Sequence, residues 1–248
     1  MAERSINAQA KIKPLMKWTW QNKQTPAEVI TKTKSLIKVE DLTLLNEPTI
    51  DFSTVRRNPL CLVTGDGNVL PEDVKKFENW NIPHDLYCVN RSMLYFQRQV
   101  DHWCAIDYEE GMWFSQNLTN QIAPDRPIVR HTIGIFPQAF DVFWQQSIEF
   151  DNDIQKRVWI GNSGYFGILT ALQMGYDRIV IAGMPMNNYA HWYEPESEYG
   201  PHWHGVAFTQ WMDFVIKKPG KAKKVRSMGE YSAFILGQAT REWAEGAN

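Results

Sequence analysis

One stretch of the chain, VWIGNSGYFGILTALQMGYDRIVIAGM at residues 158–184, does most to limit the folds open to this sequence. It predicts a strand that stops at Gly161, a helix over about 163–174 and a left-handed cap at Gly175. The nearly unbroken apolar run at 178–182 is typical of a strand whose two faces are both covered. We therefore expect the two strands to be parallel and joined by a right-handed crossover.

The same alternation of strand and helix fills the chain from Asn58 onward. Helices are expected to begin at Pro71 and soon after Asn90. Short apolar runs predict strands at 60–64, 85–89, 102–106, 127–131 and 157–160. This order predicts an α/β fold, namely a Rossmann-like, mostly parallel central sheet of about six strands with helices on both faces.

Residues 1–57 are more polar and less regular than the rest of the chain. Within them, Thr25-Pro26-Ala27-Glu28 has Thr as N-cap, Pro at N1 and Glu at N3, which predicts a helix from there to about Lys38. We interpret 1–57 as an N-terminal arm that packs on the main body or on a second subunit, so that a homo-oligomer fits the sequence. Residues 58–248 are interpreted as a single Rossmann-like domain.

Composition excludes several classes of function. Hydrophobic residues make up 44% of the 248 residues and charged residues 22%, which suits a folded core and argues against disorder. The formal net charge of −2 gives no overall attraction to nucleic acid or to an anionic membrane. The sequence has no apolar run of the roughly 18 residues that a membrane span needs, and no signal-peptide core. Three cysteines without metal spacing fall in predicted strands, which favours a reducing cytoplasm.

The loops with unusual composition all follow predicted strands, where doubly wound sheets bind their ligands. They are Gly65-Asp66-Gly67, Asn90-Arg91-Ser92, Gly161–Gly164 and the segment 186–205. The last of these, MNNYAHWYEPESEYGPHWHG, holds three Tyr, two Trp and three His, and we interpret it as a lid loop over the strand ends. This coincidence is the main reason to expect a binding site at that edge.

The turn at Gly65-Asp66-Gly67 begins like a dinucleotide fingerprint, but Leu70 stands where the third Gly belongs. NAD and FAD are therefore not favoured, and no cofactor is expected. A glycine turn can still offer backbone amides to a phosphate, although the Asp66 carboxylate would repel one unless it holds a ribose hydroxyl or a cation. A plain tight turn is the alternative.

Two further loops offer polar groups. Ser163-Gly164 lies at a predicted helix N-terminus, which favours an anion, although capping alone explains such residues equally well. The spacing there does not fit G-x-S-x-G, which argues against hydrolase chemistry. Asn90 can donate and accept hydrogen bonds, so it suits a base or a sugar, or it merely starts the next helix.

The lid segment also contains side chains that suit Zn²⁺ or Mn²⁺. They are His191, Glu194, Glu196, Glu198, His202 and His204. No helical HExxH motif accompanies them, so a histidine acting as general base is favoured over a metal site.

In this order, the motifs between Leu60 and Ser232 resemble those of bacterial sialyltransferases and their uncharacterised relatives. Gly65-Asp66-Gly67 is similar to the family's Gly-Asn-Gly turn, Asn90 to its Asn after the second strand, and Ser163-Gly164 to its Ser-Gly before the main helix. The stretch ALQMGYDRIVIAGM at 171–184 is similar to the family's helix end and following strand.

The resemblance implies a metal-independent glycosyltransferase that uses a nucleotide-linked sugar, with a CMP-sugar favoured. It also implies roles for individual residues: Tyr189 and Tyr193 would bind the leaving phosphate, and His204 or His202 would deprotonate the acceptor hydroxyl, with His204 preferred because it is nearer the helix. The nucleotide would be bound by Gly65, Asp66, Gly67, Asn90, Ser163 and Gly164.

Two residues depart from the family pattern: Asp66 replaces its Asn, and Pro185 replaces the acid that usually follows AGM. A fold can persist while its activity changes. Two alternatives therefore stay open. One is a phosphoryl or diphosphoryl transferase like the pterin diphosphokinases, and the other is a non-catalytic binding or structural protein of a phage or prophage.

Overall fold

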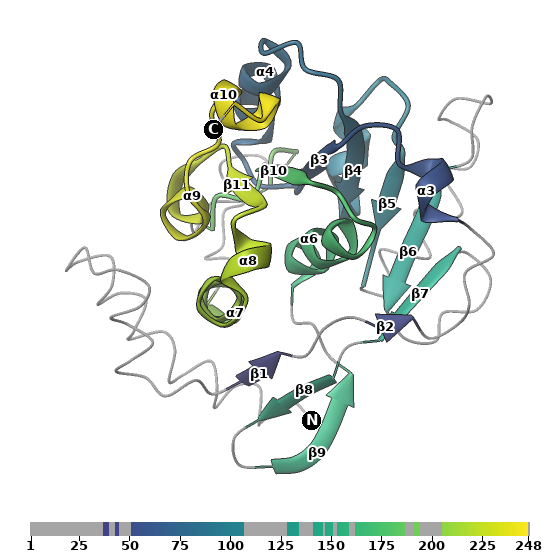
Figure 1. Ribbon diagram of the computed structural model, residues 1–248, viewed down its shortest axis with the longest axis vertical. Coiled ribbons are helices and arrows are strands. Elements are labelled where there is room, and N and C mark those ends of the chain that lie inside the picture. Colours follow the sequence, from purple (N-terminus) through teal and green to yellow (C-terminus); the bar gives the residue numbers. More distant parts are fainter. Residues whose placement is uncertain are drawn as a thin grey trace.

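The computed structural model describes residues 37–39, 43–44, 51–106, 128–133, 141–145, 147–150, 153–158, 162–186, 191–193 and 205–247. Within these ranges the strands form an eight-stranded sheet and a separate three-stranded sheet (Figure 1). Helices lie against the larger sheet, and the candidate site belongs to that sheet.

The larger sheet has the order β11-β10-β3-β4-β5-β6-β7-β2. Its strands are β2 (Thr43–Leu44), β3 (Leu60–Thr64), β4 (Asp85–Val89), β5 (His102–Cys104), β6 (Val129–Ile133), β7 (Val142–Gln145), β10 (Arg178–Ala182) and β11 (Val225–Ser227). Every neighbouring pair is parallel except β2 with β7 at one edge. The predicted Rossmann-like, mostly parallel sheet is confirmed.

The smaller sheet joins β1 (Ile37–Val39), β8 (Ser147–Phe150) and β9 (Asp153–Val158), all antiparallel. The expected parallel pairing of the strand near 157–160 with 178–182 is therefore wrong, because β9 pairs with β8 and β10 pairs with β3. The sequence of β9, DIQKRV, is mostly polar, unlike that of a strand with both faces covered. The short connection to β8 also makes a local hairpin the easier pairing.

The predicted arm contributes to both sheets where the structure describes it. Strand β1 pairs with β8, and β2 pairs with β7 at the edge of the main sheet. The helix expected from Thr25 to about Lys38 is wrong at its end, because 37–39 is a strand. The rest of that helix lies outside the described residues, as does the lid loop apart from 186 and 191–193.

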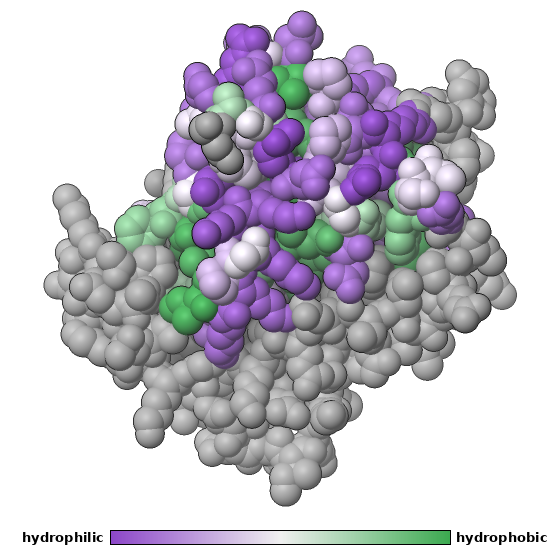
Figure 2. Space-filling model, viewed as in Figure 1, coloured by the Kyte–Doolittle hydropathy of each residue, from purple (hydrophilic) through white to green (hydrophobic). Residues whose placement is uncertain are grey.

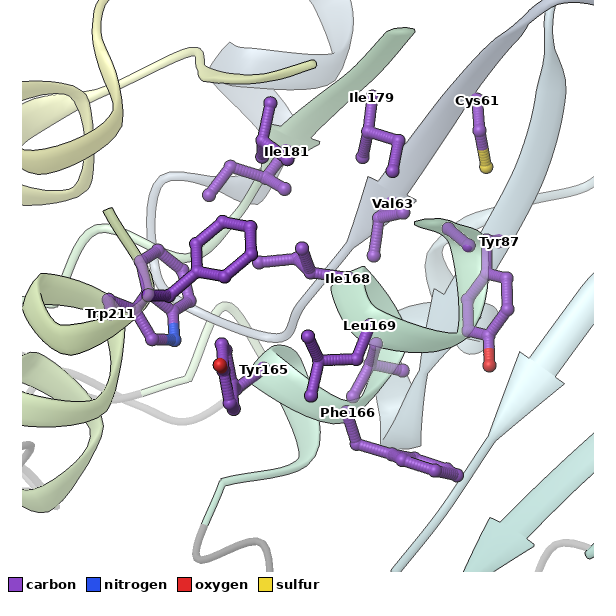
Figure 3. Close-up of a cluster of buried hydrophobic side chains, with 14 of the residues drawn as sticks. Cys61, Val63, Tyr87, Tyr165, Phe166, Ile168, Leu169, Ile179, Ile181 and Trp211 are labelled. Carbon is purple, nitrogen blue, oxygen red and sulfur yellow. The ribbon is translucent and has the colours of Figure 1, made fainter. Parts of the chain in front are cut away.

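Helices cover both faces of the main sheet, as predicted. One face packs against α6 (Ser163–Gln173), α7 (Gly205–Lys217) and α9 (Glu230–Leu236), and the other against α4 (Leu70–Glu78) and α10 (Arg241–Glu245). Figure 3 shows Ile168 and Leu169 of α6 beside Val63 and Ile181 of the sheet, with Trp211 of α7 to one side. A large apolar side chain buried in this way contributes roughly 1.5–3 kcal/mol.

Helix α6 has clear start and stop signals. The Asn162 side chain caps it by accepting a hydrogen bond from the Tyr165 amide at 2.9 Å, and Gly175 beyond its end has φ +84°. Gly167 lets the helix approach the sheet closely, because an added Cβ would lie 2.9 Å from Val89 Cγ2. These residues fix the N-terminus of α6 over the ends of β3 and β4.

Short helices complete the described part of the chain. They are α3 (Phe52–Val55), α8 (Pro219–Ala222) and the 3₁₀ helix η1 (Asn90–Tyr95), which replaces the α-helix expected after Asn90. Each of the three cysteines is free and buried in a strand, and burial raises the pKa of Cys88 to about 12. None of the described helices combines the length and apolar character that crossing a bilayer requires. The face in Figure 2 is mostly hydrophilic where it is described, with small separate apolar patches.

Candidate functional site

The order of strands places a topological switch point between β3 and β10. From β3 the chain moves outward through β4, β5 and β6, and β10 then pairs with the opposite side of β3. In such sheets the loops diverge at this point and leave a crevice for ligands at the carboxyl ends of the strands. Here those loops are 65–67 after β3 and 183–186 after β10.

The glycines of the first loop pack against the second loop. The Gly65 amide donates to Ala182 O at 2.9 Å, and the Gly67 amide donates to Gly183 O at 2.8 Å. A Cβ on Gly67 would lie 2.5 Å from Pro185 Cδ. Both amides are thus satisfied within the fold, and the tight-turn alternative accounts for both glycines without a phosphate.

Met184 fills the space between the two glycine turns. An added Cβ on Gly65 would lie 2.6 Å from Met184 Cγ, and one on Gly164 would lie 2.8 Å from Met184 Sδ. The half-buried Met184 side chain therefore contacts both the first βα turn and the start of α6. Because Met is flexible, it can shift to admit a ligand at the switch point.

Asn90 has two unusual features at the end of β4. Its φ is +50°, in the left-handed region, and its buried Oδ1 finds no hydrogen-bond partner in the part of the chain that the structure describes. A buried acceptor without a partner costs about 1–3 kcal/mol. Such outliers gather at ligand sites, where the ligand supplies the partner.

Two hydroxyl groups fix the turn that carries Asn90. Ser92 Oγ accepts from the Val89 amide at 3.0 Å and donates to Thr64 O at 2.9 Å. Thr64 Oγ1 lies 3.0 Å from Ser92 Oγ. These bonds join the end of β3 to η1 and hold Asn90 near Gly65. From the sequence alone, Ser92 is named only as part of an unusual loop and Thr64 has no predicted role, although Thr64 is a polar residue at the end of an apolar run.

The start of α6 reaches the same edge of the sheet. Ser163 and Gly164 are its first two residues, and α6 contacts both β3 and β4. The Asn162 side chain already caps the helix. The structure thus brings Gly65, Gly164 and Asn90 to the same edge of the sheet. Capping by Asn162 by itself also explains the residues at this helix start, as the sequence analysis allowed.

The described part of the segment 186–205 beyond Met186, residues 191–193, is attached to the loop after β3 and to η1. His191 forms an antiparallel bridge with Gly67, and the Trp192 amide donates to Asp66 O at 3.0 Å. On the other side, the Trp192 ring meets Tyr95 of η1 edge-on, with 5.4 Å between ring centroids. The turn therefore spans the ends of β3 and β4.

Three side chains stack where this turn meets η1. The rings of His191 and Tyr193 are nearly parallel, at 5° and 5.3 Å between centroids, and the Arg91 guanidinium carbon lies 5.3 Å from the Tyr193 centroid. Tyr193 thus lies beside the Asn90 turn.

Three predicted site residues, Tyr189, His202 and His204, lie outside the described ranges. Helix α7 begins at Gly205, directly after His204, as expected for a histidine that precedes a helix. Among the described residues no group of three metal-ligating side chains is found, and His191 is the described member of the metal alternative.

Comparison of the chain with protein-family models, with curated proteins and with solved structures finds no match. The site combines Met184 packed between two glycine turns at the switch point, an Asn whose buried oxygen has no hydrogen-bond partner among the described residues, and a ring-rich turn that spans both strand ends.

Proposed function

We propose that this chain binds a nucleotide-linked small molecule at the carboxyl edge of β3 and β4 and transfers its sugar to an acceptor hydroxyl, with a CMP-sugar as the favoured donor. The observation that carries the proposal is the buried Oδ1 of Asn90, which lacks a partner among the described residues in a turn beside the switch point. An amide side chain at that position suits the polar edge of a pyrimidine base or a ribose hydroxyl.

In this proposal the remaining residues act around the nucleotide. Asp66 holds a ribose hydroxyl, a role that a carboxylate fulfils in other switch-point sites. Met184 forms an apolar wall of the crevice, and Tyr193 and Tyr189 contact the phosphate that leaves with the nucleotide. The support from geometry is that Met184 contacts both Gly65 and Gly164, and that α6 contacts the two strands whose carboxyl ends carry Gly65 and Asn90.

The proposed reaction needs one proton transfer. The acceptor oxygen attacks the anomeric carbon of the sugar, the bond from that carbon to the phosphate oxygen breaks, and the nucleotide leaves with the electron pair. His204, or His202, takes the proton from the acceptor hydroxyl. In this proposal the start of α7 at Gly205, directly after His204, favours the neutral imidazole that can accept a proton.

The binding claim is tested by thermal shift and calorimetry with CMP, UMP, AMP, GMP, a CMP-sugar, and ATP with Mg²⁺. We expect stabilisation by CMP, because a ligand specific for the folded state raises its stability by mass action. No shift with any of these compounds at millimolar concentration contradicts the proposal. A shift with ATP and Mg²⁺ but not with CMP favours phosphoryl transfer instead.

The chain offers a matched pair of variants for the same test. Asn90 and Asn81 both have left-handed backbones, with φ +50° and +54°, and Asn81 is exposed at the end of α4. Glycine suits both backbones, so each Asn→Gly change removes only the side chain. We expect Asn90→Gly to weaken CMP binding by roughly 10-fold or more and Asn81→Gly to leave it unchanged. Equal binding by both variants removes Asn90 from the site.

A further inference from the structure

Arg91 is the charged side chain next to Asn90 at the start of η1. Its guanidinium carbon lies 5.3 Å from the centroid of the Tyr193 ring, whose other neighbour is the parallel ring of His191. All three side chains are half-buried. They come from two loops that are about a hundred residues apart in the chain, so their meeting is a product of the fold.

The position of Arg91 is fixed from both sides. Its own turn is held by the Ser92 hydroxyl, which bonds Val89 N and Thr64 O. The Tyr193 ring is held because its neighbours are anchored by the bridge from His191 to Gly67 and the bond from the Trp192 amide to Asp66 O at 3.0 Å. The stack is therefore preformed, which reduces the entropy lost when a ligand binds.

An arginine on an aromatic ring keeps its capacity to bind anions. The guanidinium interacts with the ring through its charge and its planar face, while its five N–H donors lie in a fork that matches phosphate oxygens. Tyr193 adds a hydroxyl donor and His191 a ring nitrogen. Arg91 brings a positive charge to this edge of the site, and a positive charge attracts an anionic ligand group.

We propose that Arg91, with Tyr193 and His191, forms the subsite that binds the phosphate of the nucleotide, Arg91 supplying the positive charge. This inference rests on the proposed function, because the nucleoside is positioned by the adjacent Asn90. It gives Arg91 a specificity role: the subsite distinguishes a nucleotide from a nucleoside that lacks the phosphate. Charge-assisted hydrogen bonds of this kind are the strong ones at ligand sites.

A structural role for Arg91 makes a different prediction. If Arg91 only holds the 191–193 turn in place, its loss loosens the whole site, and a ligand with or without phosphate binds more weakly. If Arg91 contacts the phosphate, only phosphate-bearing ligands lose affinity. Cytidine, CMP and inorganic pyrophosphate therefore form a sufficient set of probes.

The chain contains a matched control arginine in Arg98. It also lies over an aromatic ring, 5.8 Å from the Phe96 centroid. It is exposed, and its guanidinium lies 2.7 Å from His84 Nε2 and 3.6 Å from Glu78. Arg98→Gln thus removes a similar side chain away from the proposed subsite. Arg91→Lys is a further variant, which retains the charge and loses the fork.

The experiment is calorimetric titration of the full chain and these variants with the three probes. We expect Arg91→Gln to weaken CMP and pyrophosphate binding by roughly 10- to 100-fold, to leave cytidine affinity within about 2-fold, and Arg98→Gln to change neither. Arg91→Lys should fall between Arg91→Gln and the wild type. Unchanged CMP binding by Arg91→Gln, or equal losses for CMP and cytidine, overturns the subsite.

The same titrations separate this inference from the proposed function. If CMP binds and its affinity does not depend on Arg91, the proposed function is supported and the proposed subsite is refuted. If pyrophosphate binds through Arg91 and no nucleotide binds, the anion subsite is supported and the proposed function is refuted. If the wild-type chain binds none of the probes, both proposals are wrong.

Discussion

Two polar regions of this molecule differ in how completely their hydrogen bonds are made. Beneath α6, Asp85, Tyr176, His102 and His131 form a buried chain in which each member has a partner. At the carboxyl ends of the strands, Asn90 keeps a buried oxygen without a partner in the described ranges, and its backbone is left-handed. Satisfied buried networks stabilise one structure, whereas unsatisfied groups mark places where a ligand is expected.

The buried chain also fixes which atoms carry protons. Tyr176 donates its hydroxyl proton to Asp85 Oδ2 at 2.7 Å, so its oxygen accepts from His102 Nε2 at 2.9 Å. His102 Nδ1 is then unprotonated and accepts from His131 Nε2 at 3.3 Å. Burial lowers the pKa of His102 to about 4 and also lowers that of His131, which keeps both rings neutral.

We infer that the buried chain stabilises the fold, whereas the strand ends bind the ligand. Changes in the buried chain should affect stability and leave ligand binding by the folded protein intact. Changes at the strand ends should affect binding and turnover, with smaller effects on stability.

The largest effect is expected for the proposed base. His204→Gln should lower kcat for sugar transfer by roughly 10²–10⁴-fold while nucleotide affinity stays nearly unchanged, because the side chain acts only on the acceptor proton. His202→Gln should do much less. The measurement is release of nucleotide from the sugar donor in the presence of acceptor, and full turnover by both variants refutes the assignment.

Next comes Asp85, which anchors the buried chain. Its carboxylate accepts from Tyr176 Oη, from the Arg57 amide at 2.8 Å and from Asn58 Nδ2 at 2.7 Å. Asp85→Ala leaves these donors without a partner, so we expect the free energy of unfolding to fall by about 3 kcal/mol or more. Urea denaturation of the wild type and the variant measures this difference in the free energy of unfolding.

The control for Asp85 is Asp177, an exposed residue whose contact with Lys224 is 4.0 Å long. Asp177→Ala should change the free energy of unfolding by no more than about 0.5 kcal/mol. Similar losses for the two variants would show that the buried chain has no special part in stability.

The pH dependence of stability is the third prediction. In the folded state the pKa of His102 is about 4, below the value of about 6.5 for an exposed histidine, so the unfolded chain binds more protons between these two values. This part of the stability is complete above about pH 6.5 and is lost as the pH falls toward 4. His131 and His84 have pKa values shifted in the same direction by burial, so they add to the loss.

Urea unfolding at a series of pH values tests this slope. The His102→Gln variant retains one donor and one acceptor but does not titrate, so its stability should fall less between pH 6.5 and 5 than that of the wild type. Identical slopes for the two proteins would mean that His102 is not held neutral by burial.

The smallest effect is expected at the glycine turn. Gly65→Ala places a Cβ 2.6 Å from Met184 Cγ, which should cost about 1–3 kcal/mol of stability. Combining it with Met184→Ala should remove part of that cost, since the two residues are in contact. Gly220 has no heavy atom within 4 Å of an added Cβ, so Gly220→Ala should cost nothing. Additive effects of Gly65→Ala and Met184→Ala would contradict the contact.

The sequence predicted the parts of the fold that depend on local signals. Strands at 60–64, 85–89 and 178–182 were placed correctly because each is a continuous apolar run, and α6 because Asn162 and Gly175 mark its ends. The partner of β9 could not be read in this way, because pairing depends on contacts between distant segments.

The same limit applies to the polar groups. Asn90 was a candidate because it follows an apolar strand, but its buried unsatisfied oxygen is visible only in the fold. Tyr176 and Asp85 are 91 residues apart, and no spacing rule joins them. The sequence around Gly65 and Gly67 does not distinguish a glycine turn that binds a phosphate from one that packs against Met184 and Pro185, as this turn does.

The most direct test of the central claim is the ¹H–¹⁵N correlation spectrum of the chain during a titration with CMP. We expect the amide signals of Asp66, Asn90, Arg91 and Tyr193 to shift most, because they surround the proposed nucleotide. The signals of Asp85, His102, His131 and Tyr176 should move little, because their bonds are already complete. A spectrum that does not change with CMP, or one whose largest shifts lie in the buried chain, would contradict the account.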